Sequence, residues 1–120
     1  MRSFVSIHPY FTISDKEKAH PFLVEFVEKT KNESKCLYYG FSFHENEMHC
    51  REAYENAQGV LEHLNNVGAL IAKILSSGYA TLSKIEVHGP AEELVQLESP
   101  LAHLNPAFFN IEYGFINFTK

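Results

Sequence analysis

The sequence predicts an α+β sandwich, in which one antiparallel sheet carries helices on one of its faces. Three observations support this fold class. Several short segments alternate apolar and polar residues with the period of strands, and the segments between them repeat apolar residues at helical spacing. The order is strand, helix, strand, strand, helix, strand, helix, strand, which is typical of ferredoxin-like folds. A chain of 120 residues fits a single domain, which we expect to span residues 1–120.

The first two predicted elements are a strand over residues 3–13 and a helix that follows it directly. Pro9 cannot donate a hydrogen bond to a neighbouring strand, so we expect this strand at a sheet edge or with a bulge. Ser14 and Asp15 can cap the helix. Pro21 is unfavourable inside a helix and indicates a short lead-in before the main helix.

The middle of the chain predicts a hairpin followed by a long helix. Residues 35–44 and Glu47–Tyr54 read as two strands, and the dipeptide Glu45-Asn46 reads as the tight turn between them. Apolar residues at helical spacing predict a helix from about Asn56 to Leu75. Gly68 lies inside this segment and indicates a break of the helix into two pieces.

The last third predicts a strand, a short helix and a final strand. Residues 80–88 alternate, and Pro90 at a first helical turn opens a helix with Leu94 and Leu97 facing inward. An Asn-Pro turn then leads into a strand over residues 107–118.

The strands divide their side chains between an apolar face and a mixed face. The apolar face, which we expect the helices to cover, comprises Val5, Ile7, Leu37, Tyr39, Phe41, Phe43, Ile85, Val87, Phe109, Ile111 and Phe115. The mixed face comprises Phe4, Ser6, His8, Tyr10, Tyr38, Ser42, His44, Cys50, Tyr54, Lys84, Glu86, His88, Asn110 and Glu112. Either this face is ordinarily solvated, or a second subunit covers it and encloses a small-molecule pocket.

Composition excludes several function classes. The chain has 10 Lys and Arg against 15 Asp and Glu, a net charge of −5, so no basic stripe exists to bind nucleic acid or an anionic membrane. The apolar runs are far shorter than the roughly 20 residues that span a bilayer. Two cysteines fit a reducing compartment better than a disulfide scaffold, and we therefore expect a cytoplasmic protein.

The residues that could carry chemistry favour general acid–base catalysis. Seven histidines are many, but they form no metal-binding spacing such as CxxC or HExxH, and no nucleophile elbow or phosphate-binding glycine loop is present. A histidine or carboxylate in a cavity shielded from water is a competent base near neutral pH. The candidates are His8, Glu86 and His88 as bases, with Tyr38, Tyr54, His63 and Glu112 as residues that contact a substrate. Each of them could equally serve in a structural cross-strand or helix-packing contact.

Three stretches carry a resemblance to a known family: FVSIHPYF, CLYYGFSF and the helical AQGVLEHL, which contains His63. With these stretches the chain resembles the antibiotic-biosynthesis-monooxygenase-like family of the dimeric α/β-barrel superfamily. The resemblance implies a ferredoxin-like protomer whose sheet pairs with that of a second copy. It also implies a cofactor-independent monooxygenase, in which a base deprotonates a phenol and the anion itself reduces O₂. The family commonly has a helical histidine at the position of His63.

Some family members degrade haem, and two features of this chain argue against that activity. It has no tryptophan, although the better-known haem-degrading and polyketide-oxidising members place one in the pocket. The helix after His63 offers no histidine to bind iron. We therefore expect no cofactor and no metal, and a homodimer that binds a small aromatic molecule. The alternatives are a non-catalytic small-molecule binder, a purely structural homodimer and, third, a metal-dependent enzyme.

Overall fold

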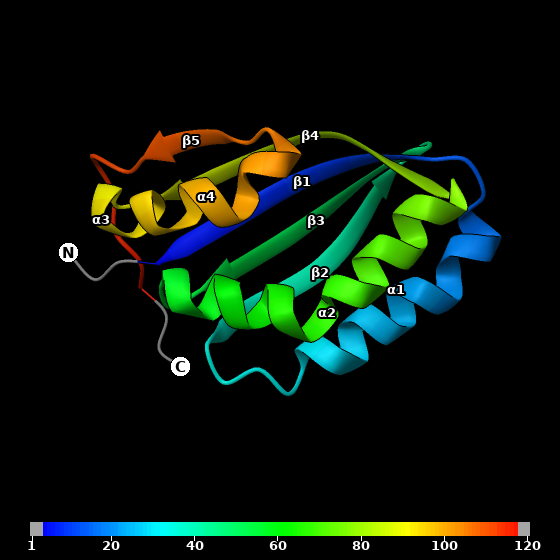
Figure 1. Cartoon of the computed structure of the whole chain (residues 1–120), viewed down its shortest axis with the longest axis horizontal. Helices are drawn as coiled ribbons and strands as arrows, with labels where there is room; N and C mark the ends of the chain where they lie inside the picture. The colour runs from blue at the N-terminus through cyan, green and yellow to red at the C-terminus, as the bar shows by residue number, and fades with distance from the viewer. Residues whose placement is uncertain (1–3, 118–120) are drawn as a thin grey trace.

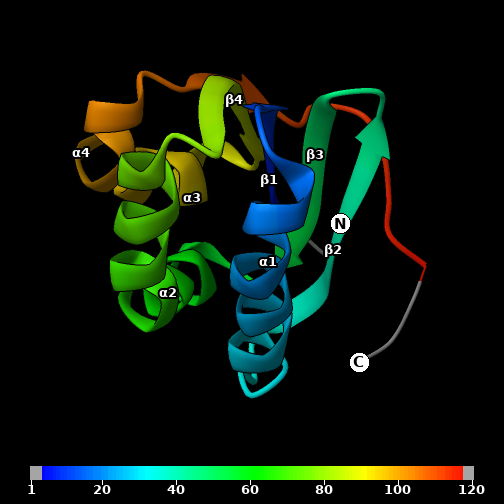
Figure 2. The same ribbon diagram turned by 90° about the vertical axis from the view of Figure 1, so that its right-hand side faces the viewer.

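The computed structural model describes residues 4–117, so Ser3 and Phe118, the predicted ends of the first and last strands, lie outside the described residues. Within this range the chain forms a sheet of five strands in the order β2-β3-β1-β4-β5, with the helices on one face (Figures 1 and 2). The strands are β1 Val5–Ile13, β2 Cys36–His44, β3 Glu47–Tyr54, β4 Ala80–Gly89 and β5 Ala107–Asn110. The predicted ferredoxin-like α+β fold is confirmed. We call the helix-covered side of the sheet the inner face and the other side the outer face.

Two long helices and one irregular helical segment form the second layer. The long helices are α1 Lys16–Thr30 and α2 Ala57–Ser77. The segment 91–104 consists of α3 Ala91–Leu94, η1 Val95–Leu97, α4 Glu98–Leu101 and η2 Ala102–Leu104, and it lies beside α2 near β4 and β5 (Figure 1). Leu94 and Leu97 are buried, as predicted. No helix within residues 4–117 is both long enough and apolar enough to cross a membrane.

Both long helices are continuous, so the predicted interruptions at Pro21 and Gly68 are wrong. Helix α1 begins at Lys16, where the Asp15 side chain accepts a 2.9 Å hydrogen bond from the Lys18 N–H, and it runs through Pro21. Helix α2 runs through Gly68 because buried residues on both sides of the glycine, such as Val67 and Leu70, fix one face of the helix on the core.

Strand β1 lies in the middle of the sheet, so the edge position predicted as one alternative for Pro9 is wrong. The other alternative, a bulge, is confirmed. The register of β1 against β4 shifts between Tyr10 and Phe11, directly after the proline. The carbonyl oxygen of Pro9 lies 3.0 Å from Nδ1 of His49 on β3. A proline is thereby accommodated between two paired strands.

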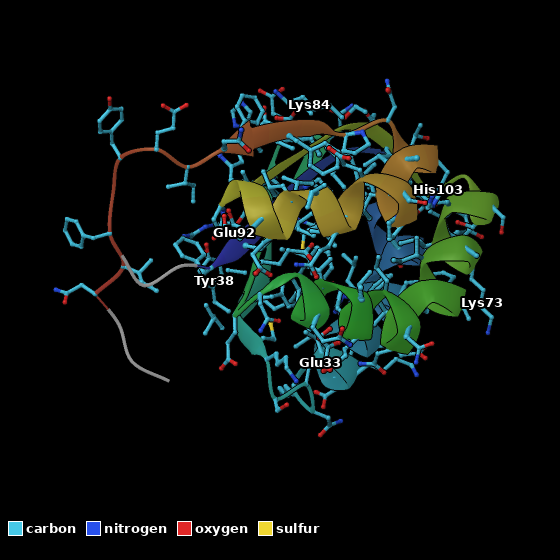
Figure 3. The ribbon with its side chains drawn as sticks, turned by 60° about the vertical axis from the view of Figure 1, so that its left-hand side comes forward. Glu33, Tyr38, Lys73, Lys84, Glu92 and His103 are labelled. Carbon is cyan, nitrogen blue, oxygen red and sulfur yellow. The ribbon has the colours of Figure 1, made fainter. Side chains whose placement is uncertain are left out.

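The final strand is shorter than the predicted 107–118, and it runs parallel to β4 while the other strand pairs are antiparallel. Since β4 ends at Gly89, the chain beyond Ile111 has no strand left to pair with. Phe115, predicted to face the helices, is 81% exposed, and the stretch after β5 leads away from the sheet (Figure 3). Phe109 is also misassigned, because it stacks on His88 of the outer face with ring centroids 4.6 Å apart.

The inner face holds two groups of buried apolar residues. One group surrounds Val5, Val87 and Leu97, and the other surrounds Leu23, Phe26 and Met48. Partly buried side chains attached to both groups line a cavity between the sheet and the helices. The two groups therefore place a hollow on the inner face of the sheet.

Candidate functional site

The cavity between the sheet and the helices has a volume of about 90 Å³ and mostly apolar walls. These walls include Ile7, Phe26, Phe41, Ile71, Leu82 and Leu104. Four side chains with hydrogen-bonding atoms also line it: Tyr39, Cys50, Glu52 and His63. An apolar hollow with a few convergent polar groups is the usual composition of a small-molecule site. This cavity lies on the inner face, whereas the sequence placed the pocket on the mixed face.

The β2–β3 hairpin brings three of these side chains together. Its two-residue turn, Glu45-Asn46, pairs Tyr39 with Glu52 and Phe41 with Cys50. Residues directly opposite on neighbouring strands share a face, so the inward position of Tyr39 carries Glu52 inward as well. Cys50 and Tyr54, which the sequence assigned to the mixed face, are consequently buried on the inner face.

Glu52 is a buried carboxyl group that accepts a short hydrogen bond from Tyr54. Only 6% of the residue is exposed, and the Tyr54 hydroxyl donates a 2.6 Å hydrogen bond to its Oε1. Burial raises the pKa of Glu52, with the His63 charge and the Tyr54 hydrogen bond opposing that rise. Burial also raises the pKa of the Cys50 thiol and of the Tyr39 and Tyr54 hydroxyls, so all three remain neutral near pH 7.

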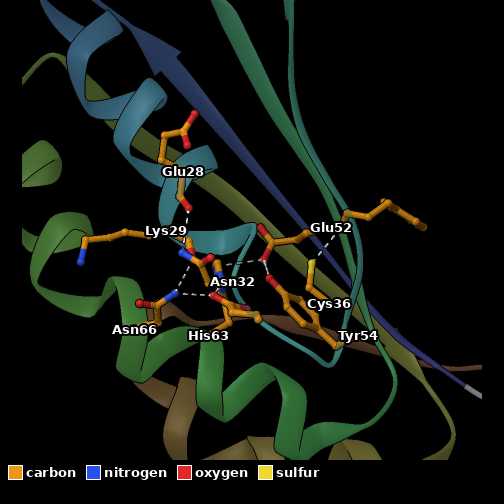
Figure 4. Close-up of polar contacts among 10 residues, drawn as sticks. Glu28, Lys29, Asn32, Cys36, Glu52, Tyr54, His63 and Asn66 are labelled. Atoms are coloured by element: carbon orange, nitrogen blue, oxygen red, sulfur yellow. Dashed lines mark hydrogen bonds and ion pairs between the residues drawn. The ribbon is translucent and has the colours of Figure 1, made fainter. Parts of the chain in front are cut away.

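His63 on α2 connects Glu52 to a second buried carboxylate (Figure 4). Its Nδ1 lies 2.8 Å from Oε2 of Glu33, and its Nε2 lies 3.6 Å from Oε1 of Glu52. An ionised carboxylate only accepts hydrogen bonds, so the contact with Glu33 favours the tautomer with the proton on Nδ1. The lone pair of Nε2 then faces Glu52. We call Glu33, Glu52, Tyr54, His63 and Asn66 the polar cluster.

Asn66 holds Glu33 in place, one turn along α2 from His63. Its Nδ2 donates to Oε2 of Glu33 at 2.8 Å and to the Lys29 carbonyl at the end of α1 at 3.0 Å. Oε1 of Glu33 is buried and has no hydrogen-bond partner among residues 4–117. The loop after α1 is thus tied to α2 through a carboxylate that also orients the imidazole.

The three predicted bases lie together on the outer face, away from the cavity. The His8 ring lies 4.9 Å from that of His88 and 5.7 Å from that of His49, measured between centroids. Oε1 of Glu86 lies 3.7 Å from Nε2 of His88. Burial, followed by the charges of His88 and His49, lowers the pKa of His8. The structure brings these residues together, and their catalytic role stays a prediction.

The four predicted substrate contacts are dispersed. His63 lines the cavity and Tyr54 bonds to Glu52 beside it, whereas Tyr38 lies on β2 with the Arg51 guanidinium 5.3 Å from its ring centre. Glu112 is exposed beyond β5. Within residues 4–117, no group of three or more His, Cys, Asp or Glu side chains is arranged to hold a metal ion.

Sequence reasoning missed Glu33, Glu52 and Asn66. The hairpin turn contained the signal for Glu52, because a two-residue turn at 45–46 places it opposite Tyr39. Glu33 stands in an irregular loop, where no periodicity assigns a direction to its side chain. Nothing in the sequence pointed to Asn66, because its role depends on the hydrogen bond to Glu33, which only the packing of the two segments reveals.

Comparison with solved structures identifies a close relative. The crystal structure of MupZ from Pseudomonas fluorescens is 42% identical to this chain, with a TM-score of 0.86, over 98% of this chain and 96% of that one. The chain belongs to the MupZ family. The match to MupZ extends over nearly the full length of this chain, so it includes the segment 91–104, which covers part of the cavity.

More distant structures share the fold of the MupZ family. A conserved Bacteroides thetaiotaomicron protein described as a possible oxidoreductase is 18% identical, with a TM-score of 0.61, over 72% of this chain and 97% of that one. Rv0793 from Mycobacterium tuberculosis is 17% identical, with a TM-score of 0.58, over 73% and 93%. At this level of identity these neighbours show the shared ferredoxin-like fold alone. The chain matches no family model and no curated protein.

Proposed function

We propose that this protein is an enzyme that carries out general acid–base catalysis on a small, mainly apolar molecule bound in the inner cavity. The observation that carries the proposal is the position of His63 between two buried carboxyl groups, Glu33 and Glu52, at the wall of an otherwise apolar cavity. Catalytic acids and bases are commonly found where burial shifts their pKa values.

The two ends of the imidazole have different tasks in this proposal. Glu33 fixes the Nδ1–H tautomer and stabilises the imidazolium that forms when Nε2 accepts a proton from the substrate. Glu52, whose pKa is raised by burial, would act as the general acid that donates a proton to the substrate. Tyr54 holds the Glu52 carboxyl group in a fixed orientation through its 2.6 Å hydrogen bond. One substrate atom would lose a proton to His63 while another gains one from Glu52.

The oxidative form of this chemistry is the cofactor-independent monooxygenase predicted from the sequence. His63 would deprotonate a phenol, and the phenolate would reduce O₂ by one-electron steps. One oxygen atom would enter the product, and the other would leave as water with two hydrogens from the substrate. The mostly apolar walls of the cavity support this second candidate, as does the fold shared with a structure described as a possible oxidoreductase.

The test is a turnover screen with purified protein. Phenols, hydroquinones and aliphatic alcohols are incubated with the enzyme, while product formation is followed by mass spectrometry and O₂ uptake with an oxygen electrode. We expect His63→Asn and Glu52→Gln each to lower the rate about 10²–10⁴-fold. Outer-face variants Glu86→Gln and His88→Ala are the controls and should retain the rate. The proposal is wrong if the control variants lose activity while the His63 and Glu52 variants keep it, or if ligands bind without any turnover.

We further propose that the outer face pairs with a second copy of the chain, as predicted from the resemblance. This face of the sheet, which no helix covers, carries rings such as Tyr10, Tyr38 and His49. Light scattering coupled to size-exclusion chromatography should give twice the 13.7 kDa of the chain. A stable monomer at micromolar concentration would contradict the pairing.

A further inference from the structure

We infer that residues 112–117 of one copy of the chain bind along strand β2 of a second copy. We call these residues the C-terminal arm. The inference rests on the pairing of two copies proposed above, and it names a contact that joins them. It concerns a surface outside the inner cavity, so it does not depend on the catalytic proposal.

Strand β2 forms one edge of the sheet, and its composition is unusual for an edge. Among residues 4–117 it pairs with β3, and no strand lies along its other side. Proteins commonly protect such an edge with charged side chains or proline, but β2 contains no Asp, Glu, Lys, Arg or Pro. None of its nine residues is buried, whereas β1, β3 and β4 each contain several buried residues. This edge is therefore suited to an added strand.

The C-terminal arm has the sequence of a strand, and no strand among the described residues pairs with it. The alternating pattern predicted a strand through this segment, whereas β5 ends at Asn110. The chain then leads away from the sheet (Figure 3), on the side opposite the helices (Figure 2). Tyr113 is 94% exposed and Phe115 is 81% exposed. Burial of these two aromatic side chains against an apolar surface would be favourable.

A groove beside β2 complements the arm. It has a volume of about 200 Å³ and is lined by Tyr38–Ser42 of β2 together with Arg51 of β3. The rings in this groove suit an aromatic side chain such as that of Phe115. Of the described residues that line it, only Arg51 is charged, and Glu112 is the only charged residue of the arm. The opposite charges therefore favour binding of the arm at this groove.

The length of the arm favours a second copy over its own chain. The arm begins beyond β5, four strand spacings or about 19 Å from β2. Six extended residues span at most about 22 Å, so crossing its own sheet would leave almost none of them to pair with β2. Sheets packed face to face lie only about 10 Å apart. A twofold axis along the strands places the β5 edge of one copy opposite the β2 edge of the other, and about half of the arm then remains for β2.

Charge reversal in two separate chains tests the exchange. Glu112→Arg and Arg51→Glu should each weaken dimerisation about tenfold in sedimentation equilibrium, because each places like charges in both arm contacts of the dimer. Mixing the two variants should restore the wild-type affinity, since one contact of the mixed dimer is then wild type and the other has its charges exchanged. Native mass spectrometry identifies the mixed dimer. A mixture that dimerises no better than its components would overturn the inference.

Removal of the aromatic side chains tests the arm independently. Tyr113→Ser combined with Phe115→Ser should weaken dimerisation at least about tenfold and speed hydrogen exchange of the β2 amides. Val24→Ser combined with Val95→Ser changes exposed apolar residues on two helical segments and is the control, with folding checked by far-UV circular dichroism. An arm variant that dimerises as tightly as the wild type would also overturn the inference.

Failure of the inference and failure of the proposed pairing give different results. If the wild-type chain and the arm variants form equally stable dimers, the pairing stands and the arm contact is wrong. If the wild-type chain is a monomer at micromolar concentration, both are wrong.

Discussion

The hydroxyl group of Tyr54 donates a 2.6 Å hydrogen bond to Oε1 of Glu52, two positions earlier on the same strand. Residues two apart on a strand point to the same face, so β3 alone sets this contact. The same oxygen lies 3.6 Å from Nε2 of His63 on α2. The bond therefore fixes the carboxyl group that the imidazole faces.

Removing the Tyr54 hydroxyl should raise the pKa of Glu52 further. The hydrogen bond stabilises the ionised carboxylate, so in Tyr54→Phe the ionised form loses a donor while the group remains buried. Leaving a buried acceptor unsatisfied should also lower the free energy of unfolding by about 1–3 kcal/mol. Titration of the Glu52 side-chain carbon by ¹³C NMR, together with urea denaturation, measures both effects. A pKa that falls or stays constant would contradict this assignment.

Replacing Glu33 should change the proton distribution on His63. In the wild-type protein we expect the proton on Nδ1, because the Glu33 carboxylate accepts a hydrogen bond from the Nδ1–H group. A glutamine at position 33 can donate or accept, so Glu33→Gln should weaken that preference. Long-range ¹H–¹⁵N NMR distinguishes the tautomers. Glu28→Gln, which alters only an exposed ion pair with Lys31, is the matched control. A wild-type protein with the proton on Nε2 would refute the orientation by Glu33.

The stability of the fold should depend on pH through Glu52. Its pKa is raised above the ordinary 4.5 because burial favours the protonated form. The folded protein thus binds the proton more tightly than the unfolded chain, and this contribution is complete below pH 4.5 and is lost as pH rises through the raised pKa. The difference in unfolding free energy between wild type and Glu52→Gln, measured by urea denaturation, should therefore shift against the wild type as pH increases. A difference that favours the wild type at higher pH would show that the pKa is lowered.

Two glycines of α2 should respond oppositely to alanine. A Cβ at Gly59 would lie 3.0 Å from the Cβ atoms of Lys35 and Tyr54, so Gly59→Ala should push the helix from the hairpin and cost about 1–3 kcal/mol. Nothing lies within 4 Å of a Cβ at Gly68, where alanine should stabilise the helix by up to about 1 kcal/mol. Thermal unfolding of both variants provides the comparison. Equal changes in the same direction would contradict the close approach of α2 to Tyr54.

The order of elements could be predicted from the sequence because alternation and helical spacing are local properties. The predicted face was wrong for Cys50 and Tyr54 on β3. The register set by the hairpin turn places each β3 residue on the same face as its β2 partner, and alternation within β3 alone does not contain this information. The contact between Glu33 and His63 joins residues 30 positions apart, and only the packing of α1 against α2 brings them together. The last strand was predicted too long because its apolar residues continue after its partner strand has ended.

The order of wall residues along the chain separates two properties of the cavity. Tyr39, Cys50, Glu52 and His63 lie between residues 39 and 63, whereas the apolar wall residues come from both sides of this segment, Ile7, Phe11 and Phe26 before it and Ile71, Leu82 and Leu104 after it. The polar side chains of the cavity are thus encoded in one short stretch of the gene, and its apolar walls in stretches on both sides. Substitutions in the flanking stretches would change which molecule fits while the polar side chains stay intact, a route by which relatives could diverge in ligand and keep the same polar groups.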